Sequence, residues 1–187
     1  YNGAKQLGYV PPGAMGYPKP VIRDDGVQEL FDWCDVDYKE YMHVLLRATL
    51  MLSIKQSFSG VIDFNDQIYM PSLFGGTFPR YPLVMGDEAQ DFSPLNHAML
   101  DKLARGRLIA VGDPWQSIYA FRGAKTRSMG ELTERFKAET YTLSLCFRCA
   151  KPIVEAARWR APALRWMNEN GRYEILKDLK RSDILEN

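Results

Sequence analysis

Two clusters of polar residues, each placed after an apolar run, could together hydrolyse a nucleotide. Asp87 and Glu88 follow the run at residues 81–86, and Gln116 lies shortly after the run at residues 107–112. Adjacent acids suit phosphoryl transfer, because Asp87 could hold Mg²⁺ through its water shell while Glu88 orients and deprotonates the attacking water. The amide of Gln116 could sense the γ-phosphate. We therefore predict half of a nucleotide-hydrolysis site here.

The same acids also have a purely structural interpretation. Asp87, Glu88 and Asp91 could simply cap a helix that follows them, since negative charges at the start of a helix interact favourably with its dipole. An Asp-Glu pair after a strand does not decide between catalysis and capping, so both interpretations stay open from these residues alone.

Aromatic residues and an arginine follow closely after Gln116. Tyr119, Phe121 and Arg122 could bind a single strand of nucleic acid, because stacking on an aromatic side chain contributes about 1–3 kcal/mol per base. Two aromatics near a strand are more often part of a core. The order of acids, Gly-Asp, Gln and then an aromatic-x-aromatic-Arg-Gly group favours a site that couples nucleotide state to base stacking.

An α/β fold would bring both clusters to one edge of a sheet. Apolar runs alternate with helical patterns, which is typical of a mostly parallel sheet, and ligands bind beyond the carboxyl ends of its strands. The predicted strands are residues 81–86, which we expect to be buried, 107–112, 141–145 and 173–176. The predicted helices are residues 37–55, capped by Asp35 or Asp37, 94–106 and 151–160. Residues 1–26 and 71–82 are predicted to be mostly loop.

The composition is that of an ordinary globular chain. Hydrophobic residues make up 46% and charged residues 25% of the 187 positions, which argues against wholesale disorder. The formal charge of +1 supplies no global field for polyanions, so any contact with nucleic acid depends on local arrangement. Three cysteines cannot pair completely, and neither a signal peptide nor an apolar run of membrane length occurs. We therefore expect no membrane contact and a reducing, cytoplasmic location.

Three segments of the sequence match a known set of motifs. Residues 87–91 read DEAQD, residues 111–124 read VGDPWQSIYAFRGA and residues 145–148 read LCFR. These segments resemble motifs II, III and IV of the UvrD/Rep-like superfamily 1 DNA helicases. Residues 62–66, which read IDFND, resemble the Asp-Phe-Asp-Asp segment that precedes motif II in that family. The similarity covers residues 59–157.

The resemblance implies a role for each residue of the nucleotide site. Asp87 would coordinate Mg²⁺, and Glu88 would be the catalytic base. Gln116 would contact the γ-phosphate. Gln90 and Asp113, which belong to the same motifs, would contribute to nucleotide binding.

The resemblance also implies contacts with DNA and a second catalytic group. Tyr119 and Phe121 would meet bases of single-stranded DNA, and Arg122 would link the DNA site to the nucleotide site. Arg148 matches the motif IV arginine, which reaches the γ-phosphate as an arginine finger.

Motif IV departs from the family pattern around its arginine. The family usually has Asn-Tyr-Arg-Ser, whereas Cys146 and Cys149 flank Phe147 and Arg148 in this chain. The resulting Cys-x-x-Cys pair has zinc or redox chemistry as an alternative interpretation. Only Cys34 and two scattered histidines are left to complete a zinc site, without a second pair at zinc spacing, and we expect neither role.

The architecture implied by the resemblance is a pair of RecA-like lobes with ATP in the cleft between them. Residues 58–140 would form the C-terminal half of the first lobe, and residues 141–187 the start of the second. Residues 1–57 would be a loop and helix from an inserted helical subdomain. We therefore expect an incomplete α/β fold of the P-loop NTPase type, a RecA-like parallel sheet with flanking helices plus an N-terminal helical piece. Because the sequence begins at Tyr1, we expect a fragment of a longer chain.

No Walker A loop, Gly-x-x-x-x-Gly-Lys-Ser/Thr, occurs in the 187 residues. Without this loop and its lysine the β- and γ-phosphates have no cradle. We expect the isolated chain to hydrolyse ATP negligibly. The full-length protein would be an ATP-dependent DNA helicase that couples hydrolysis to translocation on single-stranded DNA and to duplex unwinding. Its expected cofactors are ATP and Mg²⁺, and its expected partners are single-stranded DNA and single/double-strand junctions.

Two other functions fit the same motifs. The chain could be a non-catalytic single-stranded-DNA-binding or interaction module that kept the helicase surface, or the motor part of a helicase-nuclease. The sequence of residues 93–96 resembles that of phage-type members of the helicase family. For a phage-encoded protein, the expected location is the host cytoplasm. Arginines and tryptophans between residues 158 and 172 are expected to form a solvated helix face with two packed tryptophans, because residues 141–187 carry nine Lys+Arg against six Asp+Glu.

Overall fold

The computed structural model describes residues 1–34, 36–116 and 127–171. The chain divides into two compact units, Tyr1–Ala138 and Glu139–Asn187, which are described separately below. In the described residues, helices accompany two short parallel sheets, which confirms the expected α/β class. None of the described helices is both long enough and apolar enough to cross a membrane.

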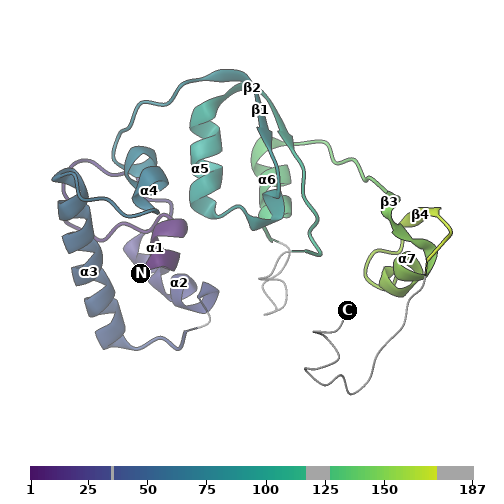
Figure 1. Ribbon diagram of the computed structural model, residues 1–187. Coiled ribbons are helices and arrows are strands. Elements are labelled where there is room, and N and C mark those ends of the chain that lie inside the picture. Colours follow the sequence, from purple (N-terminus) through teal and green to yellow (C-terminus); the bar gives the residue numbers. More distant parts are fainter. Residues whose placement is uncertain (35, 117–126, 172–187) are drawn as a thin grey trace, which may run out of the picture. The chain divides into compact units, whose positions relative to one another are not determined.

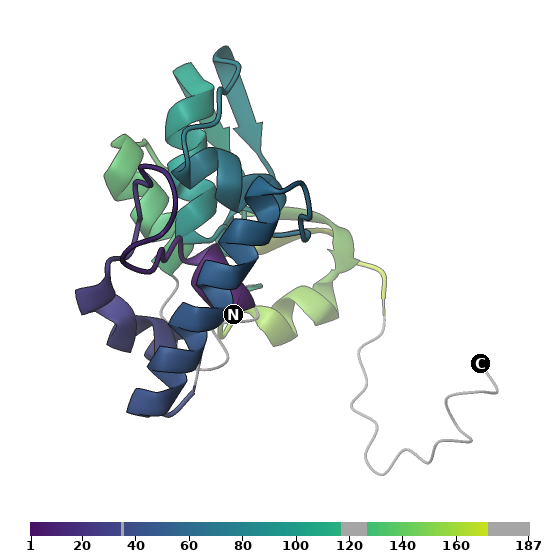
Figure 2. The ribbon, with the colours of Figure 1, turned by 90° about the vertical axis from the view of Figure 1, so that its left-hand side faces the viewer.

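The first part of the larger unit is helical (Figure 1). It contains α1 (Asn2–Gln6), the 3₁₀ helix η1 (Asp24–Gly26), α2 (Val27–Trp33), α3 (Glu40–Phe58) and α4 (Asp66–Leu73). The short α1 lies beside α3 (Figure 2), and it supplies Ala4 to a core that also contains Leu30 and Leu50. Five residues of helix are too few to be stable alone, so packing against its neighbours holds α1 in place.

Lys5 is a buried charge that ties α1 to α3 and to the start of α4. Its side chain is 0% exposed, and its ammonium donates to Asp66 Oδ1 at 2.5 Å, to Asp63 Oδ2 at 2.8 Å and to Ser53 Oγ at 2.9 Å. Burial lowers the pKa of an ammonium, but the hydrogen bonds to Asp63 and Asp66 outweigh it and raise the pKa of Lys5. The charged cluster therefore closes the segment around residues 63–66 onto the first helix.

Two helix predictions in this part need correction. The long helix begins at Glu40 rather than near residue 37, and Lys39 occupies its capping position without a side-chain hydrogen bond. Asp37 therefore does not cap the helix, and Asp35 lies outside the described residues. Of the loop predicted over residues 71–82, residues 71–73 are instead the end of α4, with Pro71 inside the helix, whereas residues 74–80 lie outside helices and strands as predicted. Tyr69 on this helix is fully buried and donates to the Tyr9 carbonyl at 2.7 Å, so tertiary packing outweighs the proline signal.

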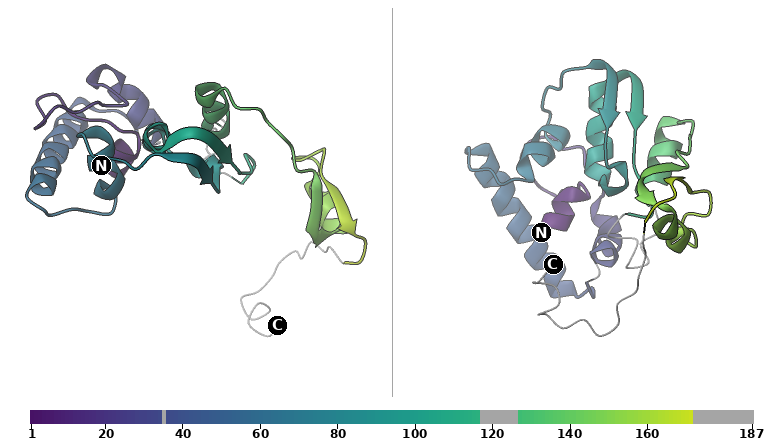
Figure 3. Two further views of the ribbon diagram at one scale, coloured as in Figure 1. Left: turned by 90° about the horizontal axis from the view of Figure 1, so that it is seen from above. Right: turned by 45° about the vertical axis from the view of Figure 1, so that its right-hand side comes forward.

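The second part of the larger unit is a two-stranded parallel sheet with helices on one face. Strand β1 (Tyr81–Gly86) pairs with β2 (Ala104–Ala110), and α5 (Pro94–Leu103) connects them after the 3₁₀ helix η2 (Ala89–Asp91). Figure 3 shows α5 and α6 (Arg127–Phe136) on the same side of the strands. Leu100 and Leu132 from these helices pack against Val84 and Leu108, which face each other across the strands.

The opposite face of this sheet is exposed, so the prediction that residues 81–86 form a buried strand is wrong. Met85 is 71% exposed, and Leu83 on the same face is also exposed. Their neighbours Ile109 and Val111 are exposed as well. Successive side chains of a strand point to opposite faces, and in the described residues α5 and α6 cover only one of them.

The smaller unit contains a second parallel pair of strands. Strand β3 (Leu145–Ala150) pairs with β4 (Arg165–Asn168), and α7 (Lys151–Ala157) lies between them in the sequence. Of the strand predicted at residues 141–145, only Leu145 belongs to a strand, because β3 begins there and residues 141–144 lie outside the strands.

The prediction of a helix face between residues 158 and 172 is also wrong for the described residues. Trp166 lies on β4, and Trp159 lies in a turn after α7 and is 78% exposed rather than packed. The strand predicted at residues 173–176 lies outside the described residues.

Candidate functional site

Parallel pairing places the two polar clusters at the same edge of the sheet. Asp87 and Glu88 directly follow β1, and the segment around Asp113 follows β2. Backbone hydrogen bonds join the two exits, because the Val111 amide donates to the Gly86 carbonyl at 2.8 Å and the Ala89 amide donates to the Val111 carbonyl at 2.9 Å. The carboxyl edge expected to hold a ligand is therefore where the acids lie.

A continuous chain of hydrogen bonds links four of the expected site residues. The Gln90 amide nitrogen donates to Glu88 Oε2 at 2.7 Å, and Gln90 Oε1 accepts the backbone N–H of Asp113 at 3.0 Å. The Asp113 carboxylate in turn accepts from the side-chain amide of Gln116 at 2.9 Å. Residues from both strand exits thus hold one another in position.

Gln90 is the buried member of this chain. Its side chain is 6% exposed, whereas Asp87, Glu88 and Gln116 are exposed at the surface of the sheet edge. A buried amide uses both its donor and its acceptor here, which fixes its orientation. The structure therefore assigns Gln90 the position of a connector, with the acids around it open to solvent.

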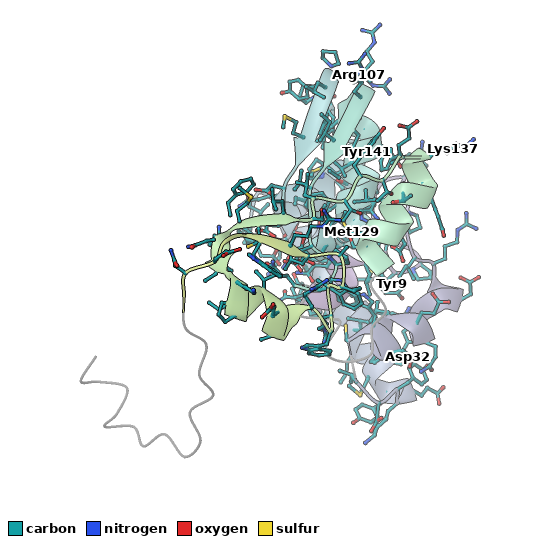
Figure 4. The ribbon with its side chains drawn as sticks, turned by 90° about the vertical axis from the view of Figure 1, so that its right-hand side faces the viewer. Tyr9, Asp32, Arg107, Met129, Lys137 and Tyr141 are labelled. Carbon is teal, nitrogen blue, oxygen red and sulfur yellow. The ribbon has the colours of Figure 1, made fainter. Side chains whose placement is uncertain are left out.

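Gly112 allows the close approach of the two loops. A Cβ at this position would lie 2.6 Å from Gln90 Oε1 and 3.0 Å from the sulfur of Met129. Met129 belongs to α6 and is labelled in Figure 4. Contacts shorter than about 3 Å between such atoms are repulsive, so a larger residue would displace the Gln90 amide. The glycine of the Gly-Asp pair thus serves packing at the site.

Glu88 has a left-handed backbone conformation, with φ 51° and ψ 41°. Residues other than glycine rarely adopt it, at a cost of about 1–2 kcal/mol. The turn brings the Glu88 side chain to Gln90 while the next residue, Ala89, pairs with the second strand exit. Backbone strain of this kind tends to gather at functional residues, and here it lies on the expected base.

The structural alternative for the acids is not borne out at the next long helix. Helix α5 is capped by Ser93, whose hydroxyl accepts the Asn96 backbone N–H at 3.3 Å while Asn96 Oδ1 accepts the Ser93 backbone N–H at 2.9 Å. This reciprocal arrangement is a capping box. Asp87, Glu88 and Asp91 lie before it, and Glu88 makes no side-chain cap on η2 either.

A buried histidine supports the turn from behind, and the sequence did not single it out. Ser128 on α6 donates to the Ala89 carbonyl at 2.7 Å, and its hydroxyl lies 3.2 Å from His97 Nε2 on α5. His97 is 2% exposed, and burial, together with the positive charge of Arg135, lowers its pKa to about 4. The imidazole is therefore neutral at pH 7, although Glu131 lies 3.8 Å from its Nδ1.

We predict that His97 makes the larger unit sensitive to mild acid. Its folded pKa lies below the ordinary value of 6.5, so the stability it contributes is present above that value and is lost as the pH falls toward 4. Such a shift corresponds to at most about 3 kcal/mol. The free energy of unfolding should fall on acidification. Urea denaturation at about pH 7 and pH 4.5 measures this change.

Matched variants separate His97 from other acid effects. His97→Gln should remove most of the loss of unfolding free energy between about pH 7 and pH 4.5, because an amide does not titrate in this range. His43→Gln should leave the loss in place. An equal loss in wild type and His97→Gln would show that another group is responsible.

The remaining expected site residues lie elsewhere. Tyr119, Phe121 and Arg122 fall outside the described residues. Arg148 lies on β3 of the smaller unit, where it is exposed. A separate open pocket of about 230 Å³ lies beside Lys5 and its partners, and its lining includes none of the expected site residues.

Asp87 fits the expected contact with Mg²⁺. Its Oδ1 accepts the Glu88 backbone N–H at 2.9 Å, and the side chain is exposed beside Glu88. Among the described residues, no group of three or more metal-ligating side chains occurs. Mg²⁺ in nucleotide sites usually has one or two carboxylates and completes its octahedron with water and phosphate oxygens, so a single exposed aspartate is compatible with it.

Comparison with known proteins identifies relatives of this chain. The UvrD/REP helicase N-terminal domain matches residues 35–137, more than half of the chain. DNA helicase II of Haemophilus influenzae is 34% identical over 109 residues, which are 53% of this chain and 15% of that protein. DNA helicase II of Escherichia coli is 27% identical over 161 residues, 83% of this chain and 20% of the relative. ATP-dependent DNA helicase srs2 of Schizosaccharomyces pombe is 38% identical over 77 residues, which are 40% of this chain and 9% of that protein. The chain thus spans a fifth or less of these relatives.

Proposed function

Because the chain belongs to the UvrD/REP helicase N-terminal domain family, we propose that the protein of which it is part is an ATP-dependent DNA helicase. That protein would couple ATP hydrolysis to movement along single-stranded DNA and to the opening of duplexes at single/double-strand junctions. The observation that carries the proposal is the chain of hydrogen bonds from Glu88 through Gln90 and Asp113 to Gln116 at the carboxyl edge of the sheet.

The acids at the edge would activate water for attack on the γ-phosphate. Bound Mg²⁺ would supply charge neutralisation on the phosphates, and Asp87 is the residue that would hold it. The Glu88 carboxylate would orient a water molecule and take its proton as the oxygen attacks. Glu88 is exposed and is held by Gln90, which suits a base that must face the nucleotide while keeping one orientation.

Gln116 would report the state of the nucleotide to the DNA site. Its side chain is exposed and donates to Asp113, so contact with a γ-phosphate would compete with a bond inside the protein. The residues that would meet DNA bases, Tyr119 and Phe121, follow within five positions, and Arg122 would connect the two sites. A change at Gln116 on hydrolysis would therefore move the segment that holds the strand.

Arg148 would complete the catalytic charge. It is exposed on β3, and a guanidinium is suited to the spread negative charge of the transferring phosphoryl group. As an arginine finger from the smaller unit it would make hydrolysis depend on closure of one lobe on the other.

DNA-stimulated ATP hydrolysis tests this function. The longer protein should hydrolyse ATP faster when single-stranded DNA is added, and the purified 187-residue chain should hydrolyse it negligibly because its sequence has no Walker A loop. Robust DNA-stimulated hydrolysis by the 187-residue chain would contradict the second expectation. A longer protein that binds single-stranded DNA without hydrolysing ATP would instead be the non-catalytic module, which is favoured only if the complete protein also lacks a Walker A loop.

A further inference from the structure

The two cysteines of the smaller unit lie on an irregular part of β3. In a regular strand, residues three apart are about 10 Å from each other and point to opposite faces. Between Cys146 and Ala150, however, β3 advances by four residues while its partner β4 advances by only two, from Trp166 to Asn168. The extra residues form a bulge, which bends the strand and brings Cys149 back toward Cys146.

The bulge places the two thiols next to each other. The backbone N–H of Cys149 donates to Cys146 Sγ at 3.3 Å, which places the Cys149 backbone against the Cys146 sulfur. Both side chains are only partly buried, so small molecules can reach them. A disulfide between Cys146 and Cys149 would need the Cys149 sulfur to approach a Cys146 sulfur that already lies 3.3 Å from the Cys149 backbone nitrogen.

The surroundings of the two sulfur atoms differ in a way that suits stepwise chemistry. The Cys149 N–H, the Arg148 N–H and the Arg148 guanidinium all favour the thiolate and lower the pKa of Cys146. The hydrogen bond to Cys146 raises the pKa of the Cys149 thiol. Cys146 is thus suited to be the attacking thiolate, and Cys149 to react in the second step. Burial raises the pKa of Cys34, which disfavours its thiolate.

Contrary to the expectation from the sequence, we propose that Cys146 and Cys149 form a redox-active pair that closes to an intramolecular disulfide by exchange with a low-molecular-weight disulfide. The Cys146 thiolate attacks one sulfur of that disulfide, the S–S bond breaks, and the first small thiol leaves with a proton from solvent. Cys149 then loses its proton to solvent, attacks Cys146 Sγ and expels the second small thiolate, which takes up a proton from solvent. The protein gives up two electrons and two protons, and the small disulfide becomes two thiols.

Zinc is a poorer occupant for the same pair. Structural zinc takes four ligands at tetrahedral positions. In the described part of the chain, the two cysteines belong to no group of three or more His, Cys, Asp or Glu side chains. Within the described residues, the dithiol therefore suits exchange chemistry better than zinc binding.

The disulfide would act on Arg148, which lies inside the ring that it closes. Linking residues 146 and 149 fixes the backbone on both sides of the arginine and removes the thiolate beside it. This consequence rests on the proposed function, because it affects catalysis only if Arg148 reaches the γ-phosphate. The thiol chemistry itself does not depend on that role.

Glutathione disulfide provides a direct test on the 187-residue chain. After exposure, free thiols are alkylated and the peptides are identified by mass spectrometry. We expect a linked peptide containing Cys146 and Cys149, with Cys34 alkylated, and an initial reaction at Cys146 about tenfold faster than at Cys34. Urea should abolish this difference between Cys146 and Cys34, which makes the test independent of any variant.

Single substitutions resolve the order of the two steps. Cys149→Ser should stop at a mixed disulfide of glutathione on Cys146, and Cys146→Ser should leave Cys149 reacting no faster than Cys34. Separate glutathionylation of both cysteines without a link, or equal rates at all three cysteines in the folded chain, would overturn the proposal. If the pair closes but the longer protein shows no ATP hydrolysis even when reduced, the proposed function fails while the redox pair stands.

Discussion

Replacing Glu88 by glutamine, in a protein that carries this segment together with a phosphate-binding loop, is expected to abolish ATP turnover while ATP still binds. Glutamine has the shape of glutamate, and its carbonyl oxygen can still accept the hydrogen bond from Gln90. It cannot take a proton from water, and loss of a general base typically lowers the rate by about 10²–10⁴-fold. The measurements are kcat with saturating single-stranded DNA and the Kd of a non-hydrolysable ATP analogue.

Asp91→Asn is the matched control for Glu88→Gln. It is also an acid-to-amide change, three positions further along the same turn, at an exposed residue outside the hydrogen-bonded chain. We expect its kcat to stay within about twofold of wild type, the range of a surface substitution. Unchanged kcat in Glu88→Gln would refute the assignment of the base, and a loss of ATP affinity equal to the loss of kcat would make Glu88 a binding residue.

Replacing Lys5 by methionine should strongly destabilise the larger unit. Methionine keeps the unbranched side chain but removes the charge, which leaves Asp66, only 3% exposed, without its ammonium partner at 2.5 Å. Removing one partner of a buried ion pair typically costs about 3–5 kcal/mol, because the other charge stays buried and uncompensated. Urea denaturation followed by circular dichroism measures the loss as a lower free energy of unfolding.

Two variants bracket the effect of Lys5→Met. Lys55→Met changes an exposed lysine in the last turn of α3 that belongs to no part of the Lys5 cluster, and it should alter the free energy of unfolding by no more than about 0.5 kcal/mol. Lys5→Met combined with Asp66→Asn should recover part of the loss, since the second change removes the stranded carboxylate. If Lys5→Met and Lys55→Met have equal effects, the cluster does not stabilise the fold.

The same cluster should also set the response to strong acid. Burial alone would raise the pKa of Asp63, but hydrogen bonds from Lys5 and Tyr1 lower it to about 2. A carboxylate with a depressed pKa contributes stability above its unfolded value near 4, and this contribution is lost as the pH falls toward 2. In Lys5→Met this part of the acid dependence should be weaker.

Much of the site could be predicted because its signals are local. Residues 81–86 are strand-forming and are followed at once by the acids, and the observed β1 has the predicted bounds. The α/β class followed from alternating patterns, and the family from the motif order, which the match to residues 35–137 confirms. The roles of the individual site residues stay predictions.

Errors arose where distant contacts or missing neighbours outweigh a local pattern. Pro71 suggested a loop, but Tyr69 on the same segment is buried against the N-terminal region, and a helix results. The apolar run of β1 suggested burial, yet a run of this kind does not say whether one or both faces of the sheet are covered.

The sequence by itself determined which residues could do chemistry at Asp87, Glu88 and Gln116, and in what order they follow their strands. Only the tertiary structure shows which residues hold these side chains in place. At the site, Gln90 joins two loops more than 20 positions apart. Away from the site, Lys5 contacts partners 48 to 61 positions away. Such pairings have no signal in local spacing, because they depend on how separate elements pack. The sequence therefore identified the acids and Gln90, whereas the hydrogen bonds that fix their geometry were found only in the structure.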